Sequence, residues 1–215
     1  MIRALVRAAA AALLVIGLAG CEVDRTFAPL SEVESRAWAE GGQPSLTLVT
    51  AIGNRDGSGG HSALVVSGSQ RVLFDPAGTW RHPTVPERGD VLYGMTPTMM
   101  DFYIDYHARP AYHVVLQRVA VSPATAERAM QLVRDHGPAS KATCGRAVSG
   151  ILRELGFEEV DRRWFPDRIM RDFASVPGVV ETKVYDDTED PWSPERRGGA
   201  GYDVEGQLVP VHAGG

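Results

Sequence analysis

The sequence predicts an α+β fold in which an antiparallel sheet packs against helices. Segments rich in β-branched residues recur between short turns in the first half of the chain, which is typical of strands joined as hairpins. Helix-start signals and helical spacing of apolar residues are frequent in the second half. The apolar fraction of 44% is ordinary for a globular protein and is sufficient for a hydrophobic core.

Five segments have the composition of strands. Only the glycine-dense turn 54–60 and the tight turn 67–70 separate the first three, so we expect an antiparallel meander. Pro76 ends the third segment, because proline cannot donate a backbone hydrogen bond. The five segments are residues 45–52, 61–66, 71–75, 112–121 and 179–185.

Helices are expected between and after these strands. Residues 98–108 are predicted to be helical because Met99, Phe102 and Tyr106 are spaced three and four apart. Ser122 can cap a second helix. The inward-facing residues of that second helix are expected to be Ala126, Ala129, Met130 and Val133. Shorter helices are expected around residues 31–40 and 166–173.

The beginning of the chain resembles a bacterial lipoprotein signal. Arg3 and Arg7 precede an apolar run over residues 8–18, and small residues then lead to Cys21. The resemblance implies that Cys21 is acylated and becomes the first residue of the mature protein. The run is too short for a membrane span of about 20 residues. An ordinary secretory signal, in which Cys21 has no role, is the alternative.

This interpretation divides the chain into four parts and places the protein in the bacterial envelope. It implies attachment to a membrane through the lipid, with the outer membrane facing the periplasm as the default location. The parts are a signal peptide over residues 1–20, a lipid-anchored tether over 21–44, a domain over 45–185, and a flexible acidic and glycine-rich tail over 186–215.

The charge balance argues against a nucleic-acid partner. The chain has 22 basic and 27 acidic residues, and removal of Arg3 and Arg7 leaves 20 against 27, a balance of −7. The same balance argues against electrostatic attraction to anionic lipid. No cofactor or metal is expected, because Asp101, Asp105 and His107 are not spaced as metal ligands. Residues 88–90 (RGD) are interpreted as an exposed turn.

Cys144 is the candidate nucleophile. If Cys21 is acylated, Cys144 is an unpaired thiol outside the cytoplasm, which indicates intermolecular pairing or a reactive group. Thr143 can cap a helix over residues 144–155, which places the thiol in the first helical turn. Backbone N–H groups and the helix dipole favour a thiolate there. The alternative is a small buried apolar residue.

His61 is the preferred base among six histidines, because it begins a strand directly after a glycine-rich turn. The others are placed in a tail, a loop, helix ends or a strand: His82, His107, His113, His136 and His212.

Four features of the sequence together resemble the circularly permuted papain-like families. They are Gly60-His61-Ser62-Ala63-Leu64, the turn 67–70, Phe74-Asp75-Pro76, and the later Cys144 at a helix start. These include the NlpC-like hydrolases and the lecithin–retinol acyltransferase group, in which the histidine precedes the cysteine. The resemblance covers roughly residues 46–155.

The resemblance implies a permuted papain-like fold with Cys144 as nucleophile and His61 as general base. Asp75 is the expected orienting residue, although the acyltransferase group usually has a second histidine slightly earlier. The implied activity is hydrolysis of an amide, with cell-wall peptide as one candidate substrate, or of an ester. The alternatives are a catalytically silent lipoprotein that binds a peptide or protein partner, and a lipid acyltransferase.

Overall fold

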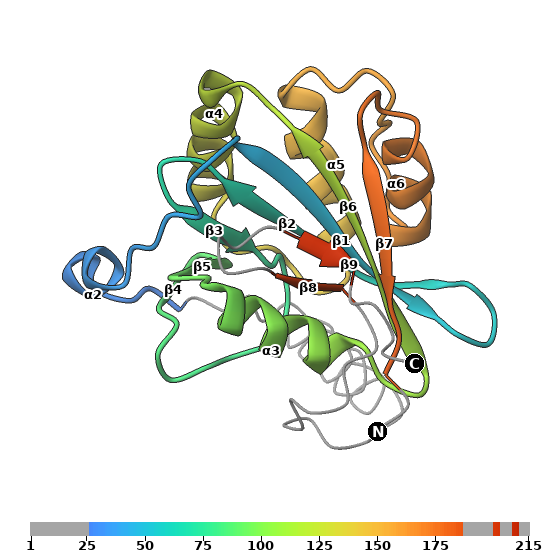
Figure 1. Ribbon diagram of the computed structural model, residues 1–215, viewed down its shortest axis with the longest axis horizontal. Coiled ribbons are helices and arrows are strands. Elements are labelled where there is room, and N and C mark those ends of the chain that lie inside the picture. Colours follow the sequence, from blue (N-terminus) through green and yellow to red (C-terminus); the bar gives the residue numbers. More distant parts are fainter. Residues whose placement is uncertain (1–25, 187–199, 203–207, 211–215) are drawn as a thin grey trace, which may run out of the picture.

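A seven-stranded antiparallel sheet organises the protein (Figure 1). The computed structural model describes residues 26–186, 200–202 and 208–210. The expected signal peptide, Cys21 and most of the expected tail lie outside these residues. Among the described helices, none combines the length and the apolar character that crossing a membrane requires.

The predicted meander forms the centre of the sheet. Strand β1 (Ser45–Gly53) pairs with β2 (Gly59–Ser67), and β2 pairs with β3 (Arg71–Phe74), in each case antiparallel. On its other side β1 pairs with β6 (Tyr112–Ala120), which in turn pairs with β7 (Val180–Val184). The five predicted strands are therefore confirmed, with ends shifted by one or two residues.

Two short strands extend the sheet beyond β3. Strand β5 (Val91–Tyr93) pairs with β3, and β4 (Glu87–Arg88) pairs with β5. Farther along the chain, β8 (Ala200–Tyr202) and β9 (Leu208–Pro210) form a separate antiparallel ladder. This ladder falls within residues 186–215, for which the sequence predicts no regular structure.

Helices cover both faces of the sheet. Helices α4 (Pro123–His136), α5 (Cys144–Glu154) and α6 (Pro166–Phe173) lie on one face, and α3 (Pro97–His107) lies on the other (Figure 1). The short helix α2 (Leu30–Ser35) precedes the sheet in sequence.

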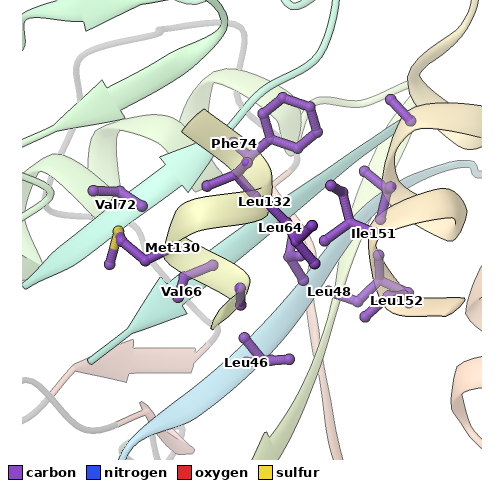
Figure 2. Close-up of a cluster of buried hydrophobic side chains, with 14 of the residues drawn as sticks. Leu46, Leu48, Leu64, Val66, Val72, Phe74, Met130, Leu132, Ile151 and Leu152 are labelled. Atoms are coloured by element: carbon purple, nitrogen blue, oxygen red, sulfur yellow. The ribbon is translucent and has the colours of Figure 1, made fainter. Parts of the chain in front are cut away.

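Alternate residues of each central strand supply two separate cores, because successive side chains point to opposite faces. Leu64 and Val66 pack with α4 and α5, whereas Ala63 and Val65 pack with α3. Figure 2 shows the first core, where leucines of β1 and β2 meet Met130 of α4 and Ile151 of α5. Because both faces are covered, all nine residues of β1 are buried, including Thr47 and Thr50.

The helix-start predictions hold in one case and fail in the other. The Ser122 hydroxyl accepts a hydrogen bond from the Thr125 N–H and caps α4, as expected. Thr143 occupies the position before α5 but does not cap it with its side chain. Its hydroxyl donates instead to the Ser140 carbonyl oxygen at 2.7 Å, which fixes the loop before the helix.

The helix predicted over residues 98–108 is confirmed as α3, but the residues whose spacing predicted it do not form its buried face. Tyr106 is exposed, and Met99 and Phe102 are only partly buried. The side chains that enter the core come from the adjacent stripe: Met100, Tyr103 and Ile104.

Residues 36–44, predicted to belong to a tether, are fixed to the sheet. The Glu40 carboxylate forms a buried ion pair with Arg71 at 2.5 Å and a second one with Arg118 at 3.1 Å. The Arg71 guanidinium also stacks over the Trp38 ring at 4.7 Å, and the Arg71 N–H donates to the Trp38 carbonyl oxygen. This segment is therefore part of the folded domain.

We predict that Glu40→Ala lowers the free energy of unfolding by about 3 kcal/mol, because it leaves the buried Arg71 charge without its carboxylate. Urea unfolding followed by circular dichroism measures this loss. Glu34→Ala on the exposed face of α2 is the control and should change stability by less than about 0.5 kcal/mol. Equal effects of the two substitutions would contradict the structural role of Glu40.

Candidate active site

The Cys144 thiol lies where the start of α5 meets β2. Cys144 is the first helical residue, so its side chain stands beside N–H groups that have no acceptor within the helix. The sulfur accepts hydrogen bonds from the backbone N–H groups of Gly145 and Ser62. The residue is free of disulfides and only 8% exposed.

The His61 imidazole bridges the thiol and a carboxylate. It forms a hydrogen bond with the Cys144 side chain. Its Nε2 atom lies 2.6 Å from Oδ1 of Asp75, which leaves Nδ1 as the ring nitrogen for sulfur. The structure therefore brings together the three residues that the sequence singles out, although Cys144 is far from the other two in the chain.

The three side chains stabilise one another in their charged forms. Burial acts to lower the pKa of His61, but the charge and hydrogen bond of Asp75, together with Cys144, raise it to about 10. Burial acts to raise the pKa of Cys144, but the hydrogen bond and charge of His61 lower it below the usual thiol value of 9.0. Both shifts favour an imidazolium–thiolate pair over the two neutral groups.

Asp75 is held by a residue that the sequence analysis missed. The buried Tyr103 hydroxyl donates to Oδ1 of Asp75 at 2.7 Å, the same oxygen that faces His61. Burial raises the pKa of Tyr103 well above its ordinary value, and the Asp75 charge adds to this, so Tyr103 remains a donor. Gly78 lies so close to Asp75 that a Cβ there would overlap Oδ2.

A second histidine stacks on His61. The ring of His107, from the last turn of α3, lies 5.5 Å from the His61 ring at an interplanar angle of 10°. Its Nδ1 atom is 2.9 Å from the Tyr103 carbonyl oxygen, and burial lowers its pKa to about 4. His107 is therefore neutral near pH 7 and does not oppose the charge on His61. The expected place of His107 at a helix end is confirmed, but the sequence analysis did not anticipate that this ring packs against His61.

Asp90 links the loop after β3 to the segment before α5. Its Oδ2 accepts hydrogen bonds from the N–H groups of Ala77 at 2.9 Å and Ala139 at 2.8 Å, and its carbonyl oxygen accepts from the Asp75 N–H. Asp90 is buried, so the interpretation of residues 88–90 as an exposed turn is wrong for this residue. Burial raises the pKa of its carboxyl.

The remaining described histidines have other partners. His82 contacts Thr84, His113 contacts Asn54, and the His136 ring packs edgewise on Phe74. His212 lies outside the described residues. In the described ranges, no group of histidine, cysteine or acidic residues has the arrangement of a metal site.

No family model, curated protein or solved structure matches this chain in comparisons with known proteins. The site is therefore interpreted from its geometry.

We predict that Cys144 alkylation by iodoacetamide follows a thiolate titration with a midpoint below pH 9.0. His61→Ala should raise this midpoint, because it removes the cation that stabilises the thiolate. His82→Ala is the control, since His82 has no contact with the thiol. Rates against pH, with the labelled residue confirmed by mass spectrometry, measure the effect. An unchanged midpoint in His61→Ala would rule out the coupled pair.

We predict that Asp90→Ala reduces Cys144 reactivity and stability more than Asp90→Asn does. Asparagine retains a carbonyl oxygen for the two N–H groups and removes the cost of a buried charge, whereas alanine loses both hydrogen bonds. Each lost hydrogen bond to the carboxylate should lower the free energy of unfolding by about 1–3 kcal/mol. Thermal unfolding and the alkylation rate of both variants test this, and identical behaviour would contradict the linking role.

Proposed function

We propose that this protein is an envelope-anchored cysteine hydrolase that cleaves an amide or ester bond. The observation that supports the proposal is the position of the His61 imidazole between the Cys144 thiol and the Asp75 carboxylate. This is the arrangement of nucleophile, base and orienting acid that acyl transfer requires.

The proposed reaction proceeds through an acyl-enzyme. The Cys144 sulfur attacks the carbonyl carbon. The carbonyl oxygen becomes negative and accepts hydrogen bonds from backbone N–H groups in the first turn of α5. The tetrahedral intermediate collapses to a thioester when the amine or alcohol leaves with the proton of His61. Water then attacks the thioester, His61 takes its proton, and the released acid regenerates the thiolate–imidazolium pair.

Asp75 and Tyr103 have supporting roles in this scheme. Asp75 fixes the ring orientation of His61 and stabilises its positive charge, and Tyr103 fixes the Asp75 carboxylate. Neither contacts the carbonyl group that reacts. Tyr103 and Asp90 are thus positioning residues that act through Asp75.

We propose a permuted papain-like fold for the domain. The order of the histidine strand, the acidic strand and the later cysteine helix supports this, as does the antiparallel sheet that carries the first two. The acyltransferase group usually has a second histidine slightly before the position of Asp75, so Asp75 is a departure from it, and His107 approaches the His61 ring from α3. Cell-wall peptide is the proposed substrate class on this analogy alone.

Two other functions are compatible with the same fold. A catalytically silent lipoprotein would bind a peptide or protein partner, and the lowered pKa of Cys144 argues against it. An acyltransferase would form the same thioester and pass it to an alcohol or amine instead of water. Acylation of Cys21 and a location in the envelope remain part of the proposal, on the sequence pattern.

We predict that p-nitrophenyl acetate acetylates Cys144 with a burst of p-nitrophenol. The burst rate should rise with pH as the thiolate forms, at a pH below 9.0, and fall as His61 loses its proton near pH 10. Cys144→Ser should abolish acetylation and Asp75→Ala should slow it at least tenfold. A stable mass increase on another residue, with Cys144 unmodified, would refute the proposal.

A further inference from the structure

Two aromatic side chains project into solvent beside the candidate site. Trp164 and Phe165, directly before α6, are 54% and 67% exposed. Two glycines near the site leave room for this segment because they have no side chain. A Cβ on Gly145, next to Cys144, would lie 2.2 Å from the Trp164 carbonyl oxygen, and one on Gly59 would lie 2.8 Å from Pro166 Cβ. We call Trp164 and Phe165 the aromatic tip.

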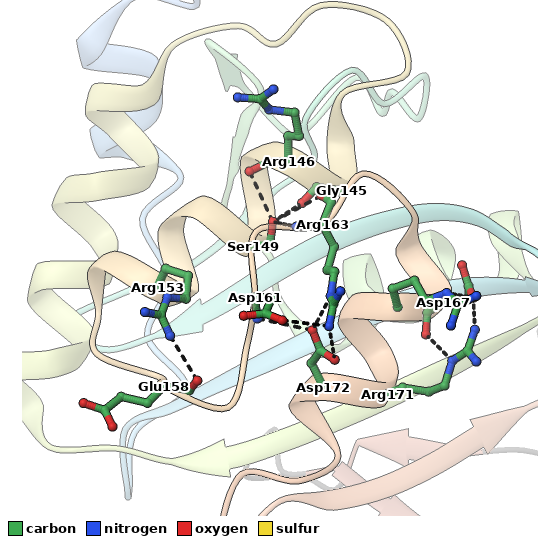
Figure 3. A network of polar contacts seen from close by, with 11 residues as sticks. Gly145, Arg146, Ser149, Arg153, Glu158, Asp161, Arg163, Asp167, Arg171 and Asp172 are labelled. Atoms are coloured by element: carbon green, nitrogen blue, oxygen red, sulfur yellow. Dashed lines mark hydrogen bonds and ion pairs between the residues drawn. The ribbon is translucent and has the colours of Figure 1, made fainter.

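The tip is held on a rigid support (Figure 3). The Ser149 hydroxyl accepts from the Arg163 N–H at 2.9 Å and donates to the Gly145 carbonyl oxygen at 2.7 Å. The Arg163 guanidinium forms a bidentate ion pair with Asp172 at 2.7 and 3.1 Å. The exposed rings are therefore presented by an ordered backbone, and a contiguous exposed apolar pair is typical of a docking surface.

A hollow of about 250 Å³ adjoins the tip along α5. The Arg146 guanidinium stacks over the Trp164 ring at 4.7 Å and also lines this hollow, so that it connects the two features. Arg162 contributes a second cation and Thr143 a hydroxyl, against one acidic residue, Glu154. We call this the cationic hollow.

The two arginines that line the hollow differ from the other arginines near the tip. Arg163, Arg168 and Arg171 of the same segment are paired with aspartates. Arg146 and Arg162 have no acidic partner within the described part of the chain. Local charge governs contact with a surface, because salt screens charges separated by more than about 8 Å at physiological ionic strength. The overall charge of −5 is spread over the whole chain, and its more distant part is screened more strongly than the charges of these two arginines.

We propose that the aromatic tip and the cationic hollow dock this protein on an anionic phospholipid surface. The rings of Trp164 and Phe165 enter the boundary between headgroups and acyl chains, where tryptophan is preferred. Arg146 and Arg162 bind the lipid phosphates at the same depth. Cys144 begins the helix that lines the hollow, so docking would place the first turn of α5 close to the membrane surface. The proposal goes beyond the hydrolase chemistry and does not require Cys144 to react.

The test uses the chain from residue 21 onward, which is the expected mature protein, with Cys21→Ser, which cannot be acylated, and with Cys144→Ser, so that catalysis is absent. Vesicles contain either phosphatidylglycerol or phosphatidylcholine with brominated acyl chains, which quench only tryptophans that enter the bilayer. We expect brominated phosphatidylglycerol vesicles to quench part of the tryptophan fluorescence of the protein. The Trp164→Phe variant should still bind these vesicles but should not show this quenching. Circular dichroism confirms that each variant is folded.

The arginines are tested in the same background. Arg146→Gln together with Arg162→Gln should weaken binding to phosphatidylglycerol about 25-fold, at about fivefold for each cation near the surface. Arg128→Gln on exposed α4 is the matched control and should have no such effect. Quenching that persists in Trp164→Phe would overturn the proposal. So would a double arginine variant that binds phosphatidylglycerol vesicles as tightly as the Arg128→Gln control. Self-association that depends on Trp164, without quenching, would assign the tip to a second copy instead.

A failed vesicle experiment leaves the hydrolase proposal intact, because acetylation of Cys144 is measured in solution. Conversely, if Cys144 is unreactive but the protein still docks through Trp164, the membrane-docking proposal is supported and the hydrolase proposal is refuted.

Discussion

The ion pair between His61 and Asp75 is the interaction on which the rest of the site depends. Both side chains are largely withdrawn from water, with Asp75 2% and His61 17% exposed, so each charge needs the other. Asp75 loses favourable hydration on burial and regains it through His61 and the Tyr103 hydroxyl. The protonated ring then supplies the positive charge that the Cys144 thiolate requires. Removing either partner would leave an uncompensated buried charge.

The pairing of β2 with β3 makes this contact possible. Leu64 lies opposite Phe74, so the start of β2 and the end of β3 lie side by side at the same end of the sheet. Asp90 connects the end of β3 to the segment that leads into α5. The loop after β3 and the segment that leads into α5 are thus joined by backbone hydrogen bonds to one carboxylate, independently of the side chains that would react.

The strands and helices were largely predictable because their signals are local. Ser122 followed by proline begins α4 at the expected position, and the composition of each strand suffices to locate it. The orientation of α3 was not predictable in this way, because its sequence has two overlapping apolar stripes. The spacing of Met99, Phe102 and Tyr106 indicates the helix, whereas Met100 and Tyr103 enter the core. The spacing of Met100, Tyr103, Ile104 and His107 was the signal that could have identified the second stripe.

The sequence by itself determined which residues could react: one cysteine at a helix start, one histidine after a glycine turn, and one aspartate at the end of the neighbouring strand. Tertiary structure alone decided that Tyr103, His107 and Asp90 surround them, and that Trp164 lies beside Gly145. The physical reason is the range of the interactions. Hydrogen bonding within a turn and strand alternation depend on near neighbours in the chain. Contacts between α3, the loop after β3 and the start of α5 depend on how the two faces of the sheet are covered, which no local pattern encodes.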